Sequence, residues 1–166
     1  MRILIICSHF NPGGITRYCL TLAKGLKDRN HEVWVASSAG QWVYKLNDYN
    51  IEHKTIPLKT KSICSFKIII SLIKLIPFLR KRKIKIVHAN TRVSQYLALL
   101  IYKLLKIPYV STFHGFHKKT IMRKLLKLEG LRTIAISEAV KNHLTQDFGI
   151  NPANIRTVYN GRPAGI

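Results

Sequence analysis

Acidic residues are scarce in this chain and unevenly placed. Only seven of its 166 residues are Asp or Glu, against 28 Lys or Arg, so the formal net charge is +21. No acid lies between Glu52 and Glu129, a stretch that contains 18 Lys or Arg. A field of one sign attracts polyanions, which makes anionic lipid, phosphorylated glycolipid and nucleic acid candidate partners. A coding bias toward lysine on a solvated surface is the alternative, and it explains the missing acids less well.

Cysteines and long apolar runs are also scarce. The three cysteines are odd in number and show no Cys-x-x-Cys spacing, so neither a disulfide framework nor a zinc site is expected. We interpret them as reduced thiols, which indicates a reducing compartment. The apolar run near the N-terminus soon meets His9 and Pro12, so it is too short for a signal peptide. No Gly-x-Gly-x-x-Gly pattern occurs, which argues against a dinucleotide-binding oxidoreductase.

Short β-rich runs alternate with runs of helical periodicity along the whole chain. Strands are predicted over residues 2–8, 32–36, 53–56, 85–89, 108–113, 133–136 and 155–159. Helices are predicted over residues 15–29, 41–49, 65–81, 93–105, 119–128 and 137–148. This alternation predicts an α/β fold, a Rossmann-like parallel sheet with helices on both faces. The length suits one domain with a real core.

The residues that follow each predicted strand are the most informative ones, because parallel sheets bind ligands outside the carboxyl ends of their strands. Glycines or polar side chains occupy five of these positions. They are residues 8–14, 90–92, 114–117, 137–138 and 160–161. Five such groups at one edge of a sheet predict one continuous cleft.

A glycine pair, Gly13-Gly14, stands at the predicted turn from the first strand to the first helix. Two residues without side chains let a ligand approach the backbone closely. The free N–H groups and positive dipole end of the helix that follows favour an anion such as a phosphate. An ordinary turn that only starts the helix is the alternative interpretation.

At this point the chain resembles the N-terminal domain of the retaining glycosyltransferases of family 4, which have the GT-B fold. The matching motifs follow the family's order over nearly the whole chain. They are residues 13–18, 30–33, 86–90, 112–115, 134–137 and 158–161. The resemblance implies an acceptor-binding domain at residues 1–160 and the start of an inter-domain linker at 161–166. It also implies that the C-terminal domain, which binds the nucleotide sugar, is absent from this chain.

The resemblance assigns roles to the residues at the strand ends. It makes His114 the predicted catalytic residue, placed to hydrogen-bond a sugar hydroxyl or to support developing charge. The predicted donor- and acceptor-binding residues are Gly13, Gly14, Arg17, Asn90, Arg92, Gly115, Ser137, Asn160 and Gly161. Asn90 and Arg92 fit a capped helix start with a solvated arginine equally well, and Ser137 is most simply an N-cap. His117 is expected at the surface.

The implied activity is sugar transfer from a nucleotide-sugar donor to a lipid-linked or polysaccharide acceptor in cell-envelope glycan synthesis. The sequence contains neither a paired acid and base nor a metal-ligand cluster. The resemblance agrees with this, because it implies neither a metal nor a tightly bound cofactor, and it implies that the domain is inactive alone. The alternative is a basic α/β domain that binds nucleic acid. No RNA-binding signature or helix-turn-helix pattern supports a specific nucleic-acid partner.

Residues 65–83 combine an apolar helix with a basic cluster. Lys67, Ser71 and Lys74 form a narrow polar stripe at helical spacing, and most other positions are Ile, Leu or Phe. The segment is too short and too charged to span a bilayer. Two interpretations stay open: a helix packed on the sheet, or one that lies in a membrane interface. We therefore expect a cytoplasmic location, and the second interpretation adds peripheral binding to the inner face of the cytoplasmic membrane through its anionic surface.

Overall fold

Seven strands form one parallel sheet in the computed structural model, which describes residues 1–60, 62–117 and 128–161. The strands are β1 (Arg2–His9), β2 (Glu32–Ser38), β3 (Glu52–Thr55), β4 (Ile86–Ala89), β5 (Tyr109–Phe113), β6 (Arg132–Ala135) and β7 (Ile155–Thr157). Their order across the sheet is β3-β2-β1-β4-β5-β6-β7, and every neighbouring pair is parallel. The predicted Rossmann-like parallel sheet is confirmed.

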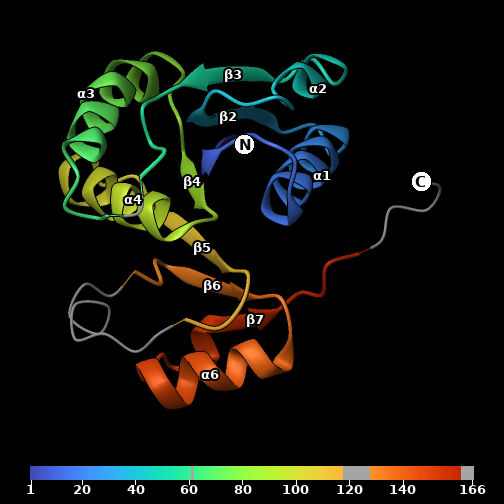
Figure 1. The fold of residues 1–166 in the computed structure, drawn as a ribbon, viewed down its shortest axis with the longest axis vertical. Helices are drawn as coiled ribbons and strands as arrows, with labels where there is room; N and C mark the ends of the chain where they lie inside the picture. The colour runs from blue at the N-terminus through green and yellow to red at the C-terminus, as the bar shows by residue number, and fades with distance from the viewer. Residues whose placement is uncertain (61, 118–127, 162–166) are drawn as a thin grey trace.

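Helices cover both faces of this sheet (Figure 1). They are α1 (Gly14–Asp28), α2 (Tyr44–Asn47), α3 (Phe66–Lys81), α4 (Arg92–Leu105) and α6 (Glu138–Phe148). Because side chains alternate along a strand, β1 serves two separate cores. Ile3 and Ile5 pack with α1 and α2 on one face, whereas Leu4 and Ile6 pack with α3 and α4 on the other. The prediction of helices on both faces is therefore confirmed.

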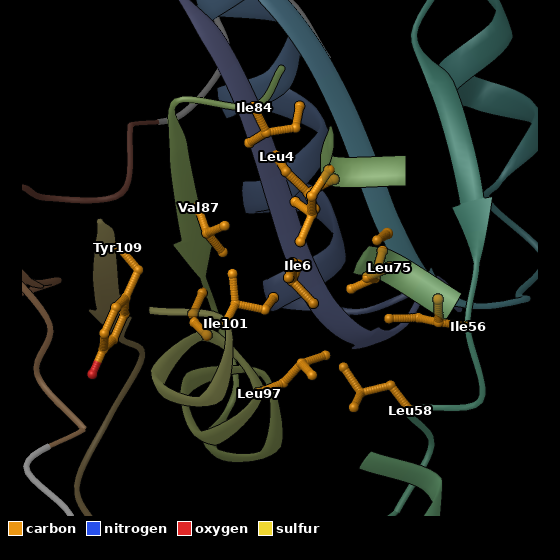
Figure 2. Close-up of a cluster of buried hydrophobic side chains, with 14 of the residues drawn as sticks. Leu4, Ile6, Ile56, Leu58, Leu75, Ile84, Val87, Leu97, Ile101 and Tyr109 are labelled. Atoms are coloured by element: carbon orange, nitrogen blue, oxygen red, sulfur yellow. The ribbon is translucent and has the colours of Figure 1, made fainter. Parts of the chain in front are cut away.

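The larger core lies between the sheet and helices α3 and α4. Figure 2 shows Leu75 of α3 and Leu97 and Ile101 of α4 beside Leu4 and Ile6 of β1. All five side chains are fully buried. Burial of one such side chain contributes about 2 kcal/mol. One side of α3 is thus anchored firmly to the sheet.

Several boundaries differ from the sequence-based expectation. Helix α2 has only four residues instead of nine, because the chain just before it turns back and the Trp42 N–H donates to the carbonyl of Phe10 at 2.9 Å. Strand β2 continues to Ser38, where a loop is expected, because Ser38 still pairs with His9. Strand β7 ends at Thr157. The helix predicted over 119–128 lies, apart from its last residue, outside the described residues.

Helix α3 begins where the sequence predicts, with Ser65 as its N-cap. Ser71, which the sequence places in a polar stripe with Lys67 and Lys74, is fully buried. The Ser71 hydroxyl donates to the Lys67 carbonyl at 2.7 Å, so its burial leaves no donor unsatisfied. Within the described residues, no helix is both long enough and apolar enough to cross a membrane.

The strand order reverses direction at β1. The chain runs from β1 to β2 on one side, and it returns to β4 on the other side of β1. The loop after β1 leads to α1 on one face of the sheet, and the loop after β4 leads to α4 on the opposite face. At such a switch point the two loops diverge and leave a crevice at the carboxyl ends of the strands.

Candidate functional site

A small hollow lies at this switch point. Its volume is about 180 Å³, and it is lined by Ser8, His9, Gly13, Gly14, Ile15, Thr16 and Thr91. All but one of these residues belong to the β1 strand end and the turn into α1, while Thr91 belongs to the loop after β4. The hollow therefore joins two of the five strand-end groups that the sequence predicts at one edge.

The contacts inside the chain do not require glycine at positions 13 and 14. A Cβ atom at Gly13 would come no closer than 4.0 Å to the Asn11 carbonyl oxygen, and one at Gly14 would meet nothing within 4 Å. Gly13 is also extended, with φ of 164°, a conformation that any residue adopts. At Gly40, by contrast, a Cβ atom would lie 2.3 Å from the Phe10 backbone. The open space at Gly13 and Gly14 suits close approach of a ligand to the N-terminus of α1.

A larger hollow of about 410 Å³ lies between α1 and the segment after β7. Its lining residues are Gly14, Arg17, Tyr18, Thr21, Leu22, Val158, Tyr159, Asn160 and Gly161. Four of the predicted binding residues, Gly14, Arg17, Asn160 and Gly161, thus line one space. Gly14 lines both hollows, so the two adjoin each other.

Tyr18 connects the larger hollow to a buried polar cluster at the ends of β4 and β5. Its hydroxyl lies 3.3 Å from Oγ1 of Thr112, and the same Oγ1 lies 2.6 Å from Nε2 of His88. The Tyr18 ring also meets the His114 ring edge to face, with 4.7 Å between centroids. Helix α1 therefore fixes the position of His114 through a side chain that itself lines the hollow.

Hydrogen bonds to Asn90 determine which nitrogen of His114 carries the proton. Asn90 Nδ2 donates to the His88 carbonyl at 3.3 Å, and because a carbonyl only accepts, the Asn90 oxygen must face His114. His114 Nε2 lies 3.4 Å from that oxygen, so Nε2 carries the hydrogen. In the neutral ring, Nδ1 then keeps its lone pair. This nitrogen can accept a hydrogen bond from a hydroxyl.

Burial keeps the two histidines of this cluster uncharged at neutral pH. It lowers the pKa of His88 to about 4, and repulsion from His114 adds to the effect. Burial likewise lowers the pKa of His114 to about 4. The pKa of Tyr18 is raised, again by burial, so the phenol stays protonated. The cluster therefore offers neutral donors and acceptors, which suit sugar hydroxyls better than a fixed positive charge does.

Four predicted binding residues line neither hollow, and His114 does not line one either; Asn90 lies in the polar cluster beside His114. Arg92 is exposed at the first position of α4, and Gly115 directly follows His114. Ser137 is the N-cap of α6, where its Oγ accepts a hydrogen bond from the Val140 N–H at 3.2 Å. The N-cap interpretation is confirmed, and a binding role stays a prediction for these residues as for the other predicted site residues.

His117 differs from the expectation of a surface residue. It is half-buried, and its ring meets Phe113 with 5.6 Å between centroids. Its backbone N–H donates to Nε2 of His143 at 3.0 Å. These contacts hold His117 against β5 and α6, away from the His114 cluster.

Sequence reasoning missed Tyr18, His88 and Thr112 as parts of the site. All three lie within the motifs at residues 13–18, 86–90 and 112–115, but no role was assigned to them. One signal was present: Tyr18 stands one helical turn after Gly14, on the same side of the helix. The other two could be joined only from the strand register. His88 pairs with Val110, so Thr112 lies two residues further on the same face.

A comparison with known sequences identifies the family. Residues 12–164 match Glycosyltransferase Family 4. None of the curated protein sequences matches this chain significantly.

Solved glycosyltransferase structures share the fold. A glycosyltransferase from Rickettsia africae superposes with a TM-score of 0.82 at 23% identity, over 96% of this chain and 43% of its own. HepE of Anabaena in complex with UDP-glucose superposes with a TM-score of 0.77 at 19% identity, over 98% of this chain and 44% of its own. The lipopolysaccharide outer core galactosyltransferase WaaB superposes with a TM-score of 0.73 at 15% identity, over 96% of this chain and 46% of its own.

This chain therefore spans less than half the length of each of these three proteins. At such identities the likeness shows the fold, and the family match covers most of the sequence. The chain belongs to glycosyltransferase family 4, and its fold is that of the N-terminal domain of a GT-B glycosyltransferase.

Proposed function

We propose that this chain is the acceptor-binding part of a glycosyltransferase that moves a sugar from a nucleotide-sugar donor to a lipid-linked or polysaccharide acceptor of the cell envelope. The observation that carries the proposal is the gathering of Gly13, Gly14, Tyr18, Asn90 and His114 at the switch point of a family 4 chain. HepE was solved with UDP-glucose and WaaB is a lipopolysaccharide galactosyltransferase, which supports both the donor class and the acceptor class.

In this proposal the domain is formed by residues 1–160, and residues 161–166 begin the link to a donor-binding domain. The amides of Gly13 and Gly14 face the donor diphosphate, for which their open turn leaves room. Arg17, Asn160 and Gly161 bind the acceptor in the larger hollow. Arg92, Gly115 and Ser137 are further predicted contacts of the acceptor.

His114 acts as the catalytic residue by accepting a hydrogen bond from a sugar hydroxyl at Nδ1. Asn90 holds the opposite nitrogen and Tyr18 holds the ring, so the acceptor lone pair keeps a fixed direction. The acceptor oxygen attacks on the face from which the nucleotide leaves, and its proton passes to the departing phosphate. Positioning and electrostatics supply most of the rate in such a reaction. Neither a metal nor a tightly bound cofactor is required.

Because the main donor site lies in the other domain, the 166-residue chain alone is expected to be inactive. We place the reaction at the cytoplasmic face of the membrane, where a lipid-linked acceptor is held.

The test uses the protein as its gene encodes it, with radiolabelled nucleotide sugars and a membrane extract. We expect label in a lipid or polymer product. A protein that transfers no sugar from any donor, yet keeps duplex DNA bound at high salt, would instead fit the nucleic-acid-binding alternative.

A further inference from the structure

Helix α3 exposes an apolar strip along its outer side. The strip consists of Phe66, Ile69, Ile70 and Ile73, which are 84%, 48%, 44% and 62% exposed. We refer to these four residues as the α3 ridge. With about 3.6 residues per turn, they recur on one side of the helix over two turns. Pro77, one turn further along, is exposed as well.

The packing of α3 on the sheet does not account for the ridge. The helix meets the core through its opposite side, where Ile68, Leu75 and Leu79 are buried; Leu75 is drawn in Figure 2. A helix that only covers a sheet carries polar residues on its outer side. A contiguous exposed apolar patch marks an interaction site, whereas single exposed apolar residues are ordinary.

Positive charge flanks the ridge. Lys67, Lys74 and Lys81 follow one another at intervals of seven, which places them along one flank of the helix, and all three are exposed. Arg80 adds a fourth exposed cation near the end of the helix. Residues 53–128 contain no acid. The acid just before that stretch, Glu52, is ion-paired with Arg82.

We propose that the α3 ridge is the surface by which this protein docks on an anionic membrane. Phe66 and the three isoleucines enter the apolar boundary of the headgroup layer, while Lys67 and Lys74 meet anionic headgroups. An apolar strip flanked by lysines is the pattern of a helix that lies in the interface, and each lysine near such a surface contributes a severalfold gain in affinity. The proposal adds a docking face to the membrane location proposed above, and it does not depend on sugar transfer.

The charges beside the ridge argue against two other binding partners, a second copy of the chain and a nucleic acid. A second copy packed ridge to ridge would bring the lysines of both copies together and repel itself. A nucleic acid would find cations at the flank but no partner for the apolar centre. An anionic bilayer matches both parts of the surface, because its charge lies at the headgroups and its apolar layer lies below them.

Cys64 provides a probe beside the ridge. It is exposed two residues before Phe66, whereas Cys7 and Cys19 are buried. An environment-sensitive maleimide dye therefore labels the folded chain at this one position. We expect its emission to shift to the blue with vesicles that contain phosphatidylglycerol and to stay unchanged with pure phosphatidylcholine. No shift and no co-flotation of the unlabelled chain with the anionic vesicles at low salt would overturn the proposal.

Two pairs of variants distinguish vesicle binding through the ridge from binding through the net positive charge of the chain. Phe66→Ser with Ile73→Ser is expected to weaken vesicle binding about tenfold or more, and Tyr44→Ser serves as the control because this residue is 60% exposed on α2, far from α3 in Figure 1. Lys67→Glu with Lys74→Glu is expected to weaken binding at least tenfold. Its control is Lys24→Glu with Arg29→Glu, which changes the net charge by the same amount on α1 and at its C-cap.

Equal losses in the lysine variant and its Lys24→Glu with Arg29→Glu control would overturn the proposal, since binding would then reflect net charge alone. Equal losses in Phe66→Ser with Ile73→Ser and in Tyr44→Ser would also overturn it, since the ridge would then contribute no more than any other exposed apolar side chain. A dimer in sedimentation that disappears in Phe66→Ser with Ile73→Ser, while flotation persists, would assign the ridge to a second copy and overturn it as well. Far-UV circular dichroism confirms that each variant is folded. Vesicle binding needs neither donor nor acceptor, so its failure leaves the proposed function to its own assay.

Discussion

The switch-point crevice and the α3 ridge are two surfaces of the same fold that differ in chemical character. The crevice presents backbone amides and neutral, hydrogen-bonded side chains such as His114 and Tyr18. The ridge presents exposed apolar side chains beside lysines. The difference follows from position: strand ends, loops and helix N-termini expose backbone groups, whereas the side of a helix exposes side chains only. Polar recognition of small hydroxylated ligands is therefore expected at the crevice, and contact with an extended surface at the ridge.

The largest expected effect compares the two sides of α3. Leu75→Ala should lower the free energy of unfolding by about 3 to 4 kcal/mol, because Leu75 is fully buried and its truncation leaves a cavity. Ile73→Ala, on the ridge, should change it by less than about 0.5 kcal/mol. Urea denaturation of the 166-residue chain measures both values. Similar losses in the two variants would mean that the ridge is covered in the folded protein.

The second prediction tests the neutral character of the crevice. Burial lowers the pKa of His88 to about 4, so the unfolded chain takes up a proton near its ordinary pKa, while the folded chain does so only near 4. The contribution of neutral His88 to the free energy of unfolding is therefore fully present above about pH 6.5. It falls by about 3 kcal/mol as the pH drops toward 4. His88→Gln should flatten the slope of unfolding free energy against pH. Tyr18→Phe is the control: it alters the same cluster but should keep the slope.

The third prediction concerns catalysis. His114→Ala should lower the rate of sugar transfer about a hundredfold, because it removes the acceptor nitrogen aimed at the sugar. His117→Ala should have a much smaller effect, since this residue contacts Phe113 and His143 instead of the cluster. The assay is the radiolabel transfer described above, with the protein as its gene encodes it. Equal losses would refute the assignment of His114.

The smallest expected effect compares two glycines. Gly40→Ala should destabilise the chain by about 1 to 3 kcal/mol, because its Cβ would clash with the Phe10 backbone. Gly14→Ala should leave stability unchanged or raise it by up to about 1 kcal/mol, since the added atom meets nothing within 4 Å and alanine favours the helix. Thermal unfolding compares the two. A reduced transfer rate in stable Gly14→Ala would support close approach of a ligand, and a wild-type rate would argue against it.

Local patterns predicted much of this fold. The alternation of β-branched runs and periodic segments led to the parallel sheet, and Ser137 could be identified as an N-cap because capping depends on neighbours within one turn. The glycine pair and Asn90 could be placed after strands because the strands themselves could be predicted from local residue patterns. The partner of His114 could not be predicted. Tyr18 reaches it from α1 and Asn90 from the loop after β4, through contacts between residues far apart in the chain.

The sequence by itself determined the parallel α/β fold, the sheet edge where the candidate site is predicted and the acid-free stretch at residues 53–128, because strand alternation, helix periodicity and charge can be read residue by residue. Only the tertiary structure decided which side of α3 is buried. An apolar helix offers several faces to a sheet, and the packing of Leu75 against β1 selected one. The same choice buried Ser71 and left Phe66 and Ile73 exposed.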